Sequence, residues 1–446
     1  MTQRKVWSSA LSAILLTGLL AGCAGGNNAP AESGGQSGAA GSGSEVKEEA
    51  PKDVTLRFSW WGSEVRHKAL LEAIDLYTEN NPHVTIEPEY GGFDGYYQKL
   101  VTQFAGGTAP DLTPLSVDWI DELAVKSDLV VDLYTLKDYI DLDAFDPAFL
   151  ERYAVFGGKL AGLPMGVNGM VNLYNKDFFA KYDIPEDTKW DWQTIHEIGK
   201  RVHEQDPNAY LLGMFDYRTF LQPFVNQQTG NQWIQDDKTL GFEADSLEAA
   251  FAYYQQLLDD GVMQPVEESS LYKDLAENLQ WQQGNIGMMF TLASTIAKVK
   301  SYTPNLGVSM YPVPTDAKTS AVLVNPSNPL AISKASKHPE EAAKFASWLL
   351  TSPEAAAILK DVYSVPVVQA NADKLVADGA IDPTVNEAVQ VALENPGNPV
   401  NALSNNQELN QIAQDILERV AFKQLSAADA AAELTARLDE KLSSMP

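Results

Sequence analysis

The sequence predicts an α/β protein in which mostly parallel sheets are flanked by helices. Strand-like and helix-like patterns alternate from residue 54 onward, and the same alternation returns after residue 158. This order favours parallel strands joined by right-handed crossovers. About 394 residues follow residue 52, which is more than one hydrophobic core normally serves. We therefore expect two large lobes.

The first elements follow from hydrophobic periodicity. Apolar and polar residues alternate over 54–58, which predicts a strand, and an apolar stripe over 70–77 predicts a helix. Residues 84–90 have the pattern of a second strand. Residues 96–107 have the pattern of a helix closed by glycines, and 109–116 that of a third strand. The resulting β-α-β-α-β order places a ligand cleft beyond the carboxyl ends of these strands.

Later segments repeat these signals. Turn glycines and an apolar run within 158–179 indicate another strand, and Asp191 is placed as the N-cap of a helix over 191–205. Ser352 and Pro353 mark the start of a further helix. The remaining expected elements are a helix over 246–261, strand segments within 306–315 and 321–333, a helix over 339–351, and a helical tail from about 373.

The amino terminus has the composition of an export signal. Arg4 and Lys5 precede the apolar run "ALSAILLTGLLAG", which is too short to span a bilayer as a stable helix. The run ends at Cys23, the only cysteine, so 1–22 resembles a bacterial lipoprotein signal and Cys23 the lipidated first residue of the mature chain. The alternative is an ordinary export signal followed by an incidental cysteine. With Cys23 lipidated, neither a disulfide nor a cysteine-based metal site is possible.

A low-complexity linker follows the lipid site. Residues 24–52 are rich in glycine and contain a single aliphatic side chain larger than alanine, Val46, so the linker (23–52 with Cys23) is expected to be a flexible tether. Removal of the signal changes the formal net charge from −28 to −30. Such an acidic chain lacks the basic footprint of a nucleic-acid-binding protein.

Common catalytic and metal motifs are absent from the sequence. "HEIGK" at 196–200 has Lys200 where a zinc protease requires a second histidine. "DLDAFD" at 141–146 has Asp146 where a calcium loop requires glycine. The sequence therefore predicts no metal, no cofactor and no catalytic residue. A secreted glycoside hydrolase or lyase remains the alternative, although no motif favours it.

Several segments together carry a family resemblance. They are "SWWGSEVRHKALLEAIDLYTENNPHVTIE", "YYQKLVTQFAGGTAPDLTPLSVDWIDELA", "GKLAGLPMGVNGMVNLYNKDFF", "WQQGNIGMMFTLAS" and "LAISKASKHPEEAAKFASWLLTSPEAA". In this order the chain resembles extracellular solute-binding proteins of family 1, the sugar-binding lipoproteins of ATP-driven importers, among them the maltose-binding proteins. The resemblance implies a type II periplasmic-binding-protein fold, in which each of two lobes has a mixed, mostly parallel sheet flanked by helices.

The resemblance also implies lobe boundaries. The first lobe would comprise 53–163 and 316–360, and the second 168–312 and 361–446. Hinge crossings would then lie near 164–168, 312–316 and 360–366.

The tandem tryptophans of "FSWWGSE" suggest a sugar-binding surface. A pyranose has apolar C–H faces that pack on aromatic rings and hydroxyl edges that need fixed donors and acceptors. Trp60 and Trp61 are both candidate contacts, although strand alternation places Trp60 on the core side and makes Trp61 the better stacking ring. Ser63 and Glu64 follow as partners for sugar hydroxyls.

Further candidates come from matched family segments. Asp118 is expected to accept hydrogen bonds from sugar hydroxyls or, alternatively, to cap a helix. Phe93 and Tyr96 would close one end of the groove or pack in the core. The other candidate ligand contacts are Trp119, Asn168, Tyr217, Arg218, Thr291, Ser294, Ser327 and Asn328.

The resemblance predicts partners as well as a ligand. We expect a monomeric receptor on the extracytoplasmic face of the cell membrane, anchored through the lipid on Cys23. It would deliver an oligosaccharide to two transmembrane permease subunits driven by an ATPase pair. Arg66, His67 and Arg218 could pair with a carboxylate, which makes a uronate-containing ligand an option. Two functions of a different class also stay open, a receptor for a non-sugar solute and a surface adhesion protein.

Overall fold

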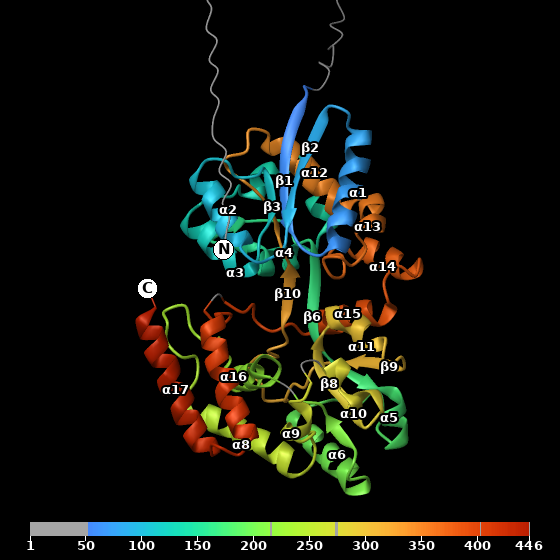
Figure 1. Ribbon diagram of the computed structural model, residues 1–446, viewed down its shortest axis with the longest axis vertical. Coiled ribbons are helices and arrows are strands. Elements are labelled where there is room, and N and C mark those ends of the chain that lie inside the picture. Colours follow the sequence, from blue (N-terminus) through green and yellow to red (C-terminus); the bar gives the residue numbers. More distant parts are fainter. Residues whose placement is uncertain (1–51, 215, 273–274, 402, 446) are drawn as a thin grey trace, which may run out of the picture. The chain divides into compact units, whose positions relative to one another are not determined.

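A computed structural model describes residues 52–214, 216–272, 275–401 and 403–445, without the side chains of Val117, Asp118, Asp121 and Leu275. The signal peptide, Cys23 and nearly all of the linker lie outside these residues. In the first sheet, the strand order is β11-β3-β1-β2, and β1 pairs in parallel with both β2 and β3. Figure 1 shows β1, β2 and β3 of this sheet. The strands are β1 (Val54–Trp61), β2 (Val84–Gly91), β3 (Leu112–Pro114) and the antiparallel β11 (Leu330–Ile332).

Helices flank the first sheet as the periodicity predicts. Leu70, Ile74 and Tyr77 are buried on one side of α1, and they join a hydrophobic cluster with Leu56 and Phe58 of β1. This cluster is the core of the first lobe. Its helices are α1 (Glu64–Asn80), α2 (Tyr96–Ala105), α3 (Val117–Ile120), α4 (Pro147–Tyr153), α12 (Pro339–Thr351) and α13 (Pro353–Leu359), with a short hairpin of β4 (Val155–Phe156) and β5 (Lys159–Leu160).

The second sheet is organised around the long strand β6 (Gly166–Asn175). It pairs antiparallel with β8, β9 and β10, whereas β7 and β8 pair in parallel. This sheet is therefore mixed with mainly antiparallel pairs, instead of mostly parallel, because three neighbours of β6 run back along it. The other strands are β7 (Tyr210–Leu212), β8 (Ile286–Leu292), β9 (Leu306–Ser309) and β10 (Val324–Ser327).

The second lobe has a separate hydrophobic cluster and most of the later helices (Figure 1). The expected caps are present, because Asp191 accepts from the amide of Thr194, and Ser352 at the start of α13 accepts from that of Ala355. The helices are α5 (Lys176–Lys181), α6 (Trp192–Gln205), α7 (Gln222–Thr229), α8 (Ala244–Asp259), α9 (Val266–Ser269), α10 (Leu279–Gln282), α11 (Ile296–Lys300), α14 (Gln369–Ala377), α15 (Pro383–Glu394), α16 (Gln407–Ala421) and α17 (Ala427–Ser444).

Shorter helical turns complete the described secondary structure. Leu133–Leu136, Leu142–Ala144, Leu275–Glu277 and Ala293–Thr295 are 3₁₀ turns, whereas Asp121–Lys126 and Tyr217–Leu221 have π-helical hydrogen bonds. The carboxyl-terminal tail is not helical throughout, because residues 395–401, which contain two prolines, lie outside any helix.

Two of the expected crossings coincide with a change of hydrophobic cluster. Met165 belongs to the first-lobe cluster and Val167 to the second-lobe cluster. Tyr363 and Val365 divide in the same way, and Val368 then contacts the first-lobe cluster once more before α14. The crossing expected at 312–316 is displaced toward the carboxyl terminus. Gln227 of α7 donates to the carbonyl of Pro312 and accepts from the amide of Lys318, so this segment stays with the second lobe.

The strand pairing gives the corrected position. β10 remains paired with β6 as far as Ser327, whereas β11 joins the first sheet from Leu330. The second crossing therefore lies at 328–329, and residues 316–327 belong to the second lobe.

Candidate functional site

The first half of the candidate site lies where β1 and β2 end. β1 ends at Trp61, and the exposed residues Ser63 and Glu64 begin α1. The Ser63 side chain makes no capping hydrogen bond, so its hydroxyl is available to a solute. Parallel strands gather their carboxyl ends at one edge of a sheet, which is the usual ligand edge of such folds.

The aromatic rings at this edge pack on one another. Trp61 and Trp119 are only 6% and 9% exposed, and their ring centroids are 5.0 Å apart. Phe93 is 54% exposed and stacks on Trp119 with a centroid distance of 5.6 Å and an interplanar angle of 12°. The accessible ring is therefore Phe93, and it lies over Trp61, which we expected to stack on sugar, and over Trp119, which we expected to be a ligand contact.

Trp60 is a core residue, as the strand alternation favoured, and it is not a ligand contact. It is fully buried, and its Nε1–H donates to Nδ1 of His67 at 3.0 Å. Tyr90, which lies opposite Trp60 on β2, stacks on the indole at 5.1 Å and is 46% exposed. Tyr90 is a second accessible ring that we missed, although its position at the end of a predicted strand could have indicated it.

Tyr96 and Asp118 remain without a demonstrated place in the site. Tyr96 is buried, and its hydroxyl hydrogen-bonds with Ser59 at 2.7 Å and with Thr113 at 3.0 Å. Tyr96 thus supports the aromatic cluster from inside instead of closing the groove. The backbone of Asp118 lies in α3, but its side chain is outside the described residues.

The second half of the candidate site is a cavity of about 530 Å³ in the second lobe. Met214 and Asp216 line it just after β7, and Thr291 and Leu292 line it at the end of β8, which pairs in parallel with β7. Apolar side chains, among them Met170 and the others at the strand ends, form part of its wall. Hydroxyls and amides are contributed by Thr219, Ser269, Tyr272, Asn278, Thr291, Thr295 and Gln414. This mixture of apolar wall and neutral polar groups suits a polyhydroxylated solute.

Two other predicted residues are hydrogen-bonded to each other. Asn168 of β6 donates from Nδ2 to Oγ of Ser294 at 2.8 Å, and its Oδ1 accepts from the amide of Ser294 at 3.1 Å. Nearby, the hydroxyls of Thr291 and Thr295 are 2.5 Å apart. The structure thus brings Asn168, Thr291 and Ser294 to the carboxyl end of β8.

Tyr217 and Arg218 follow β7 but differ in their surroundings. Tyr217 packs against the second-lobe core, and burial raises the pKa of its hydroxyl. Asp216 is engaged in a capping box with Thr219. Arg218 is exposed, lines the cavity, and forms no ion pair with a described residue. Arg218 is therefore the cation that a ligand in this cavity would meet.

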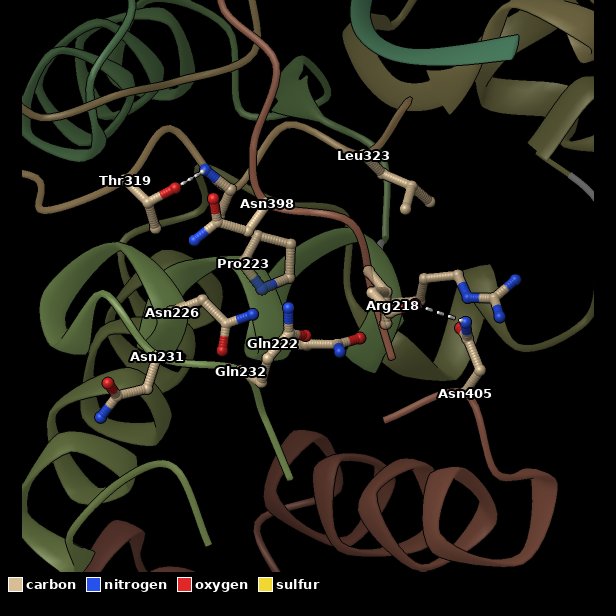
Figure 2. A pocket seen from close by; sticks show the side chains of 12 residues that line it. Arg218, Gln222, Pro223, Asn226, Asn231, Gln232, Thr319, Leu323, Asn398 and Asn405 are labelled. Atoms are coloured by element: carbon tan, nitrogen blue, oxygen red, sulfur yellow. Dashed lines mark hydrogen bonds between the residues drawn. The ribbon is translucent and has the colours of Figure 1, made fainter. Parts of the chain in front are cut away.

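A second, smaller cavity has a volume of about 30 Å³ and shares Arg218 and Leu323 with the larger one; Figure 2 shows the side chains that line it. Carboxamide side chains from α7 and from the loop before α16 line it. Two buried atoms, Nε2 of Gln222 and Oδ1 of Asn226, have no hydrogen-bond partner among the residues that the structure describes. The volume is sufficient for a water molecule, which can accept from the first atom and donate to the second.

Ser327 and Asn328 lie at the second crossing. Ser327 pairs with Gly166 at the start of β6, and Asn328 has a left-handed backbone with φ of 39°. Neither residue lines either cavity. Their position favours a role in the hinge over the ligand contact that we expected.

Of the three side chains that could pair with a ligand carboxylate, two form hydrogen bonds within the protein. Arg66 donates to the carbonyls of Trp61 and Val362, and His67 is buried with Nδ1 accepting from Trp60. An indole N–H can only donate, so His67 carries its proton on Nε2. Of the three, Arg218 is exposed, whereas Arg66 is half-buried and His67 is buried.

The described part of the chain contains neither a candidate metal site nor a candidate membrane-spanning helix. Among its residues, no group of three or more His, Cys, Asp or Glu side chains is arranged to hold a metal ion. None of the helices in the described ranges is long and apolar enough to cross a membrane.

Known proteins resemble this chain in sequence and in structure. An uncharacterized lipoprotein encoded in the oleD 5' region of Streptomyces antibioticus is 25% identical over 324 residues, 68% of each chain. A periplasmic solute binding protein from Pectobacterium atrosepticum is 27% identical with a TM-score of 0.73, covering 87% of this chain and 98% of that one. A periplasmic oligogalacturonide binding protein from Yersinia enterocolitica, in complex with saturated digalacturonic acid, is 25% identical with a TM-score of 0.69, covering 88% and 99%.

The family profile described as "Bacterial extracellular solute-binding protein" matches residues 61–356. This range begins at Trp61, the last residue of β1, and includes the residues of both halves of the candidate site except Gln414. With its two lobes and sheets flanked by helices, the chain belongs to the family of bacterial extracellular solute-binding proteins.

Proposed function

We propose that this protein is the oligosaccharide receptor of an ATP-driven importer. The cavity of about 530 Å³ at the ends of β7 and β8 carries the proposal, because its wall combines apolar side chains, neutral hydroxyls and amides, and the two charged side chains of Asp216 and Arg218. Sugars present the same combination of apolar faces and hydroxyl edges. Phe93 and Tyr90 add exposed rings at the strand ends of the first lobe. The solved relative that binds an oligogalacturonide supports the same class of ligand.

Binding would be coupled to closure of the two lobes. A ligand that contacts both lobes favours the closed form only by its higher affinity for that form. Hinge closure around a ligand is the established motion of periplasmic binding proteins. The closed receptor would dock on two membrane permease subunits driven by an ATPase pair.

A titration of the purified protein tests the receptor function. Calorimetry with a panel of neutral and uronate-containing oligosaccharides should give stoichiometric binding of at least one member, and product analysis should show no turnover. Small-angle scattering should show compaction at saturation with the bound sugar. Turnover would instead identify a carbohydrate-active enzyme, and no heat with any saccharide would point to a non-sugar solute.

The exposed guanidinium of Arg218 favours an acidic oligosaccharide as the substrate. A carboxylate accepts paired hydrogen bonds from this planar fork, whereas neutral sugars gain little from the charge. Arg218→Gln should therefore weaken digalacturonate binding at least tenfold and leave the affinity for a neutral oligosaccharide within twofold. Arg218→Lys, which keeps the charge and loses the fork, is the matched variant and should be intermediate. An equal loss of affinity for digalacturonate and for the neutral oligosaccharide would contradict the proposal that Arg218 selects acidic sugars.

Membrane attachment through Cys23 is a separate part of the proposal. The lipobox-like end of residues 1–22 and the lipoprotein relative from Streptomyces antibioticus support it. Each buried methylene of an acyl chain contributes about 0.8 kcal/mol to anchoring. Cells expressing the full chain should incorporate a palmitate analogue into the protein, and Cys23→Ala should abolish the label and release the protein from the membrane fraction. Unchanged labelling would contradict the lipid site.

A further inference from the structure

Arg66 connects the loop after β1 to the third crossing. Its guanidinium donates from Nε and Nη2 to the carbonyl of Val362, at 3.1 and 2.9 Å, and from Nη1 to the carbonyl of Trp61, at 3.1 Å. It also lies 4.2 Å from the centre of the Tyr363 ring. All these contacts are directional, so they hold the guanidinium in one orientation.

The segment that Arg66 holds is locally strained. Lys360 and Ser364 have positive φ angles, of 49° and 78°. Residues other than glycine seldom adopt this conformation, and strain of this kind persists only where the surroundings impose it. Val362 and Tyr363, the residues that Arg66 contacts, lie between the two strained positions.

Immediately after Tyr363, which Arg66 contacts, the chain passes from the first-lobe cluster to the second-lobe cluster. Tyr363 is buried in the first-lobe cluster, whereas Val365 belongs to the second-lobe cluster and accepts from the amide of Val167 at 2.8 Å. Gly166 has no room for a side chain here, because a Cβ would lie 2.0 Å from the carbonyl oxygen of Tyr363. Ser364 is thus the only residue between a part fixed on one lobe and a part fixed on β6.

We propose that Ser364 is the pivot of the third crossing and that Arg66 is a positioning residue which couples the Trp61–Glu64 loop to this pivot. A solute that moves the loop would shift the carbonyl of Trp61, and the rigid guanidinium would pass the displacement to Val362. The assignment of the pivot stands on geometry alone, whereas the role of the loop as a ligand contact rests on the proposed function.

Gly62 provides a way to disturb the loop without any ligand. A Cβ at this position would lie 2.6 Å from Cδ of Arg66. Gly62→Ala should therefore displace the Arg66 side chain from its contacts and reproduce the effect of Arg66→Ala.

The distance between the lobes in the unliganded protein tests the proposal. Spin labels on Asp75→Cys in α1 and Glu197→Cys in α6, in a full chain with Cys23→Ser, report this distance by pulsed electron resonance. Both sites are exposed. Arg66→Ala, Gly62→Ala and Ser364→Gly should each broaden the distance distribution or add a second population, and Arg66→Lys should give an intermediate result. Thermal unfolding confirms that each variant is folded.

Asp183→Gly is the matched control, because Asp183 also has a left-handed backbone, with φ of 51°, on an exposed turn in the second lobe. It should leave the distribution unchanged. Folded Arg66→Ala or Arg66→Lys with the parental distribution would overturn the coupling, and a parental distribution for Ser364→Gly would overturn the pivot. Because no sugar is present, these outcomes are independent of the titration that tests the receptor function.

Discussion

Asn168 and Ser294 are 126 residues apart in the chain, yet two hydrogen bonds join them. Asn168 lies on β6 just beyond the first crossing, and Ser294 follows the end of β8. The pair therefore ties the strand that enters the second lobe to the turn beside the candidate sugar cavity.

Asn168→Ala removes both bonds and should lower the free energy of unfolding by about 1–2 kcal/mol. We also expect weaker sugar binding, because the turn at Ser294 would lose its anchor. Asn168→Asp keeps the acceptor for the amide of Ser294 and loses the donor to its hydroxyl, so its effect should be smaller. Urea denaturation and calorimetry measure the two quantities. Equal stability of Asn168→Ala and the parent would contradict a structural role of the pair.

Phe93→Ala should reduce sugar affinity about fivefold with little change in stability. The ring is exposed at the edge of the first lobe, and an aromatic contact contributes about 1 kcal/mol beyond its buried area. Phe422, which is 40% exposed at the end of α16, provides the matched control. Phe422→Ala should leave the affinity unchanged. A loss of affinity in both variants would indicate a general effect of removing exposed rings.

In contrast to Phe93→Ala, Trp60→Phe should lower the stability of the protein and leave its sugar affinity unchanged. The smaller ring leaves a void in a fully buried position and deprives Nδ1 of His67 of its donor. We expect a loss of about 2–4 kcal/mol in the free energy of unfolding. The folded variant should bind sugar as the parent does. A Trp60→Phe variant that is as stable as the parent but binds sugar weakly would show that Trp60 contacts the ligand.

The Asp128 carboxylate should make stability depend on acid pH. Hydrogen bonds from Lys159 and Lys334 lower its pKa to about 2. A folded-state pKa below the unfolded value stabilises the protein above about pH 4, and this contribution is lost as the pH falls toward 2. Asp128→Asn should thus lower the melting temperature at pH 7 and converge with the parent near pH 2.

Asparagine tolerates the left-handed backbone of Asp128, whose φ is 53°, so this change tests the charge alone. Asp183→Asn is the control, since Asp183 has the same backbone and no ion pair with a described residue. It should show no such convergence. A difference between Asp128→Asn and the parent that persists at pH 2 would contradict the electrostatic explanation.

The sequence alone was sufficient for the class of fold and for most elements near the site. Strand and helix periodicities are local, and so are caps such as Asp191 and Ser352, since each depends on residues within one turn. Alternation along β1 correctly assigned Trp60 to the core.

Only the tertiary structure decided which rings face solvent and where the chain changes lobes. Trp61 is covered by Trp119 and Phe93, which come from other segments, so its burial could not be read from β1. The second crossing moved to 328–329 because Gln227, about 90 residues earlier, holds the segment that begins at Pro312. The exposure of a side chain and the position of a hinge depend on contacts between distant parts of the chain, and a local sequence pattern does not record those contacts.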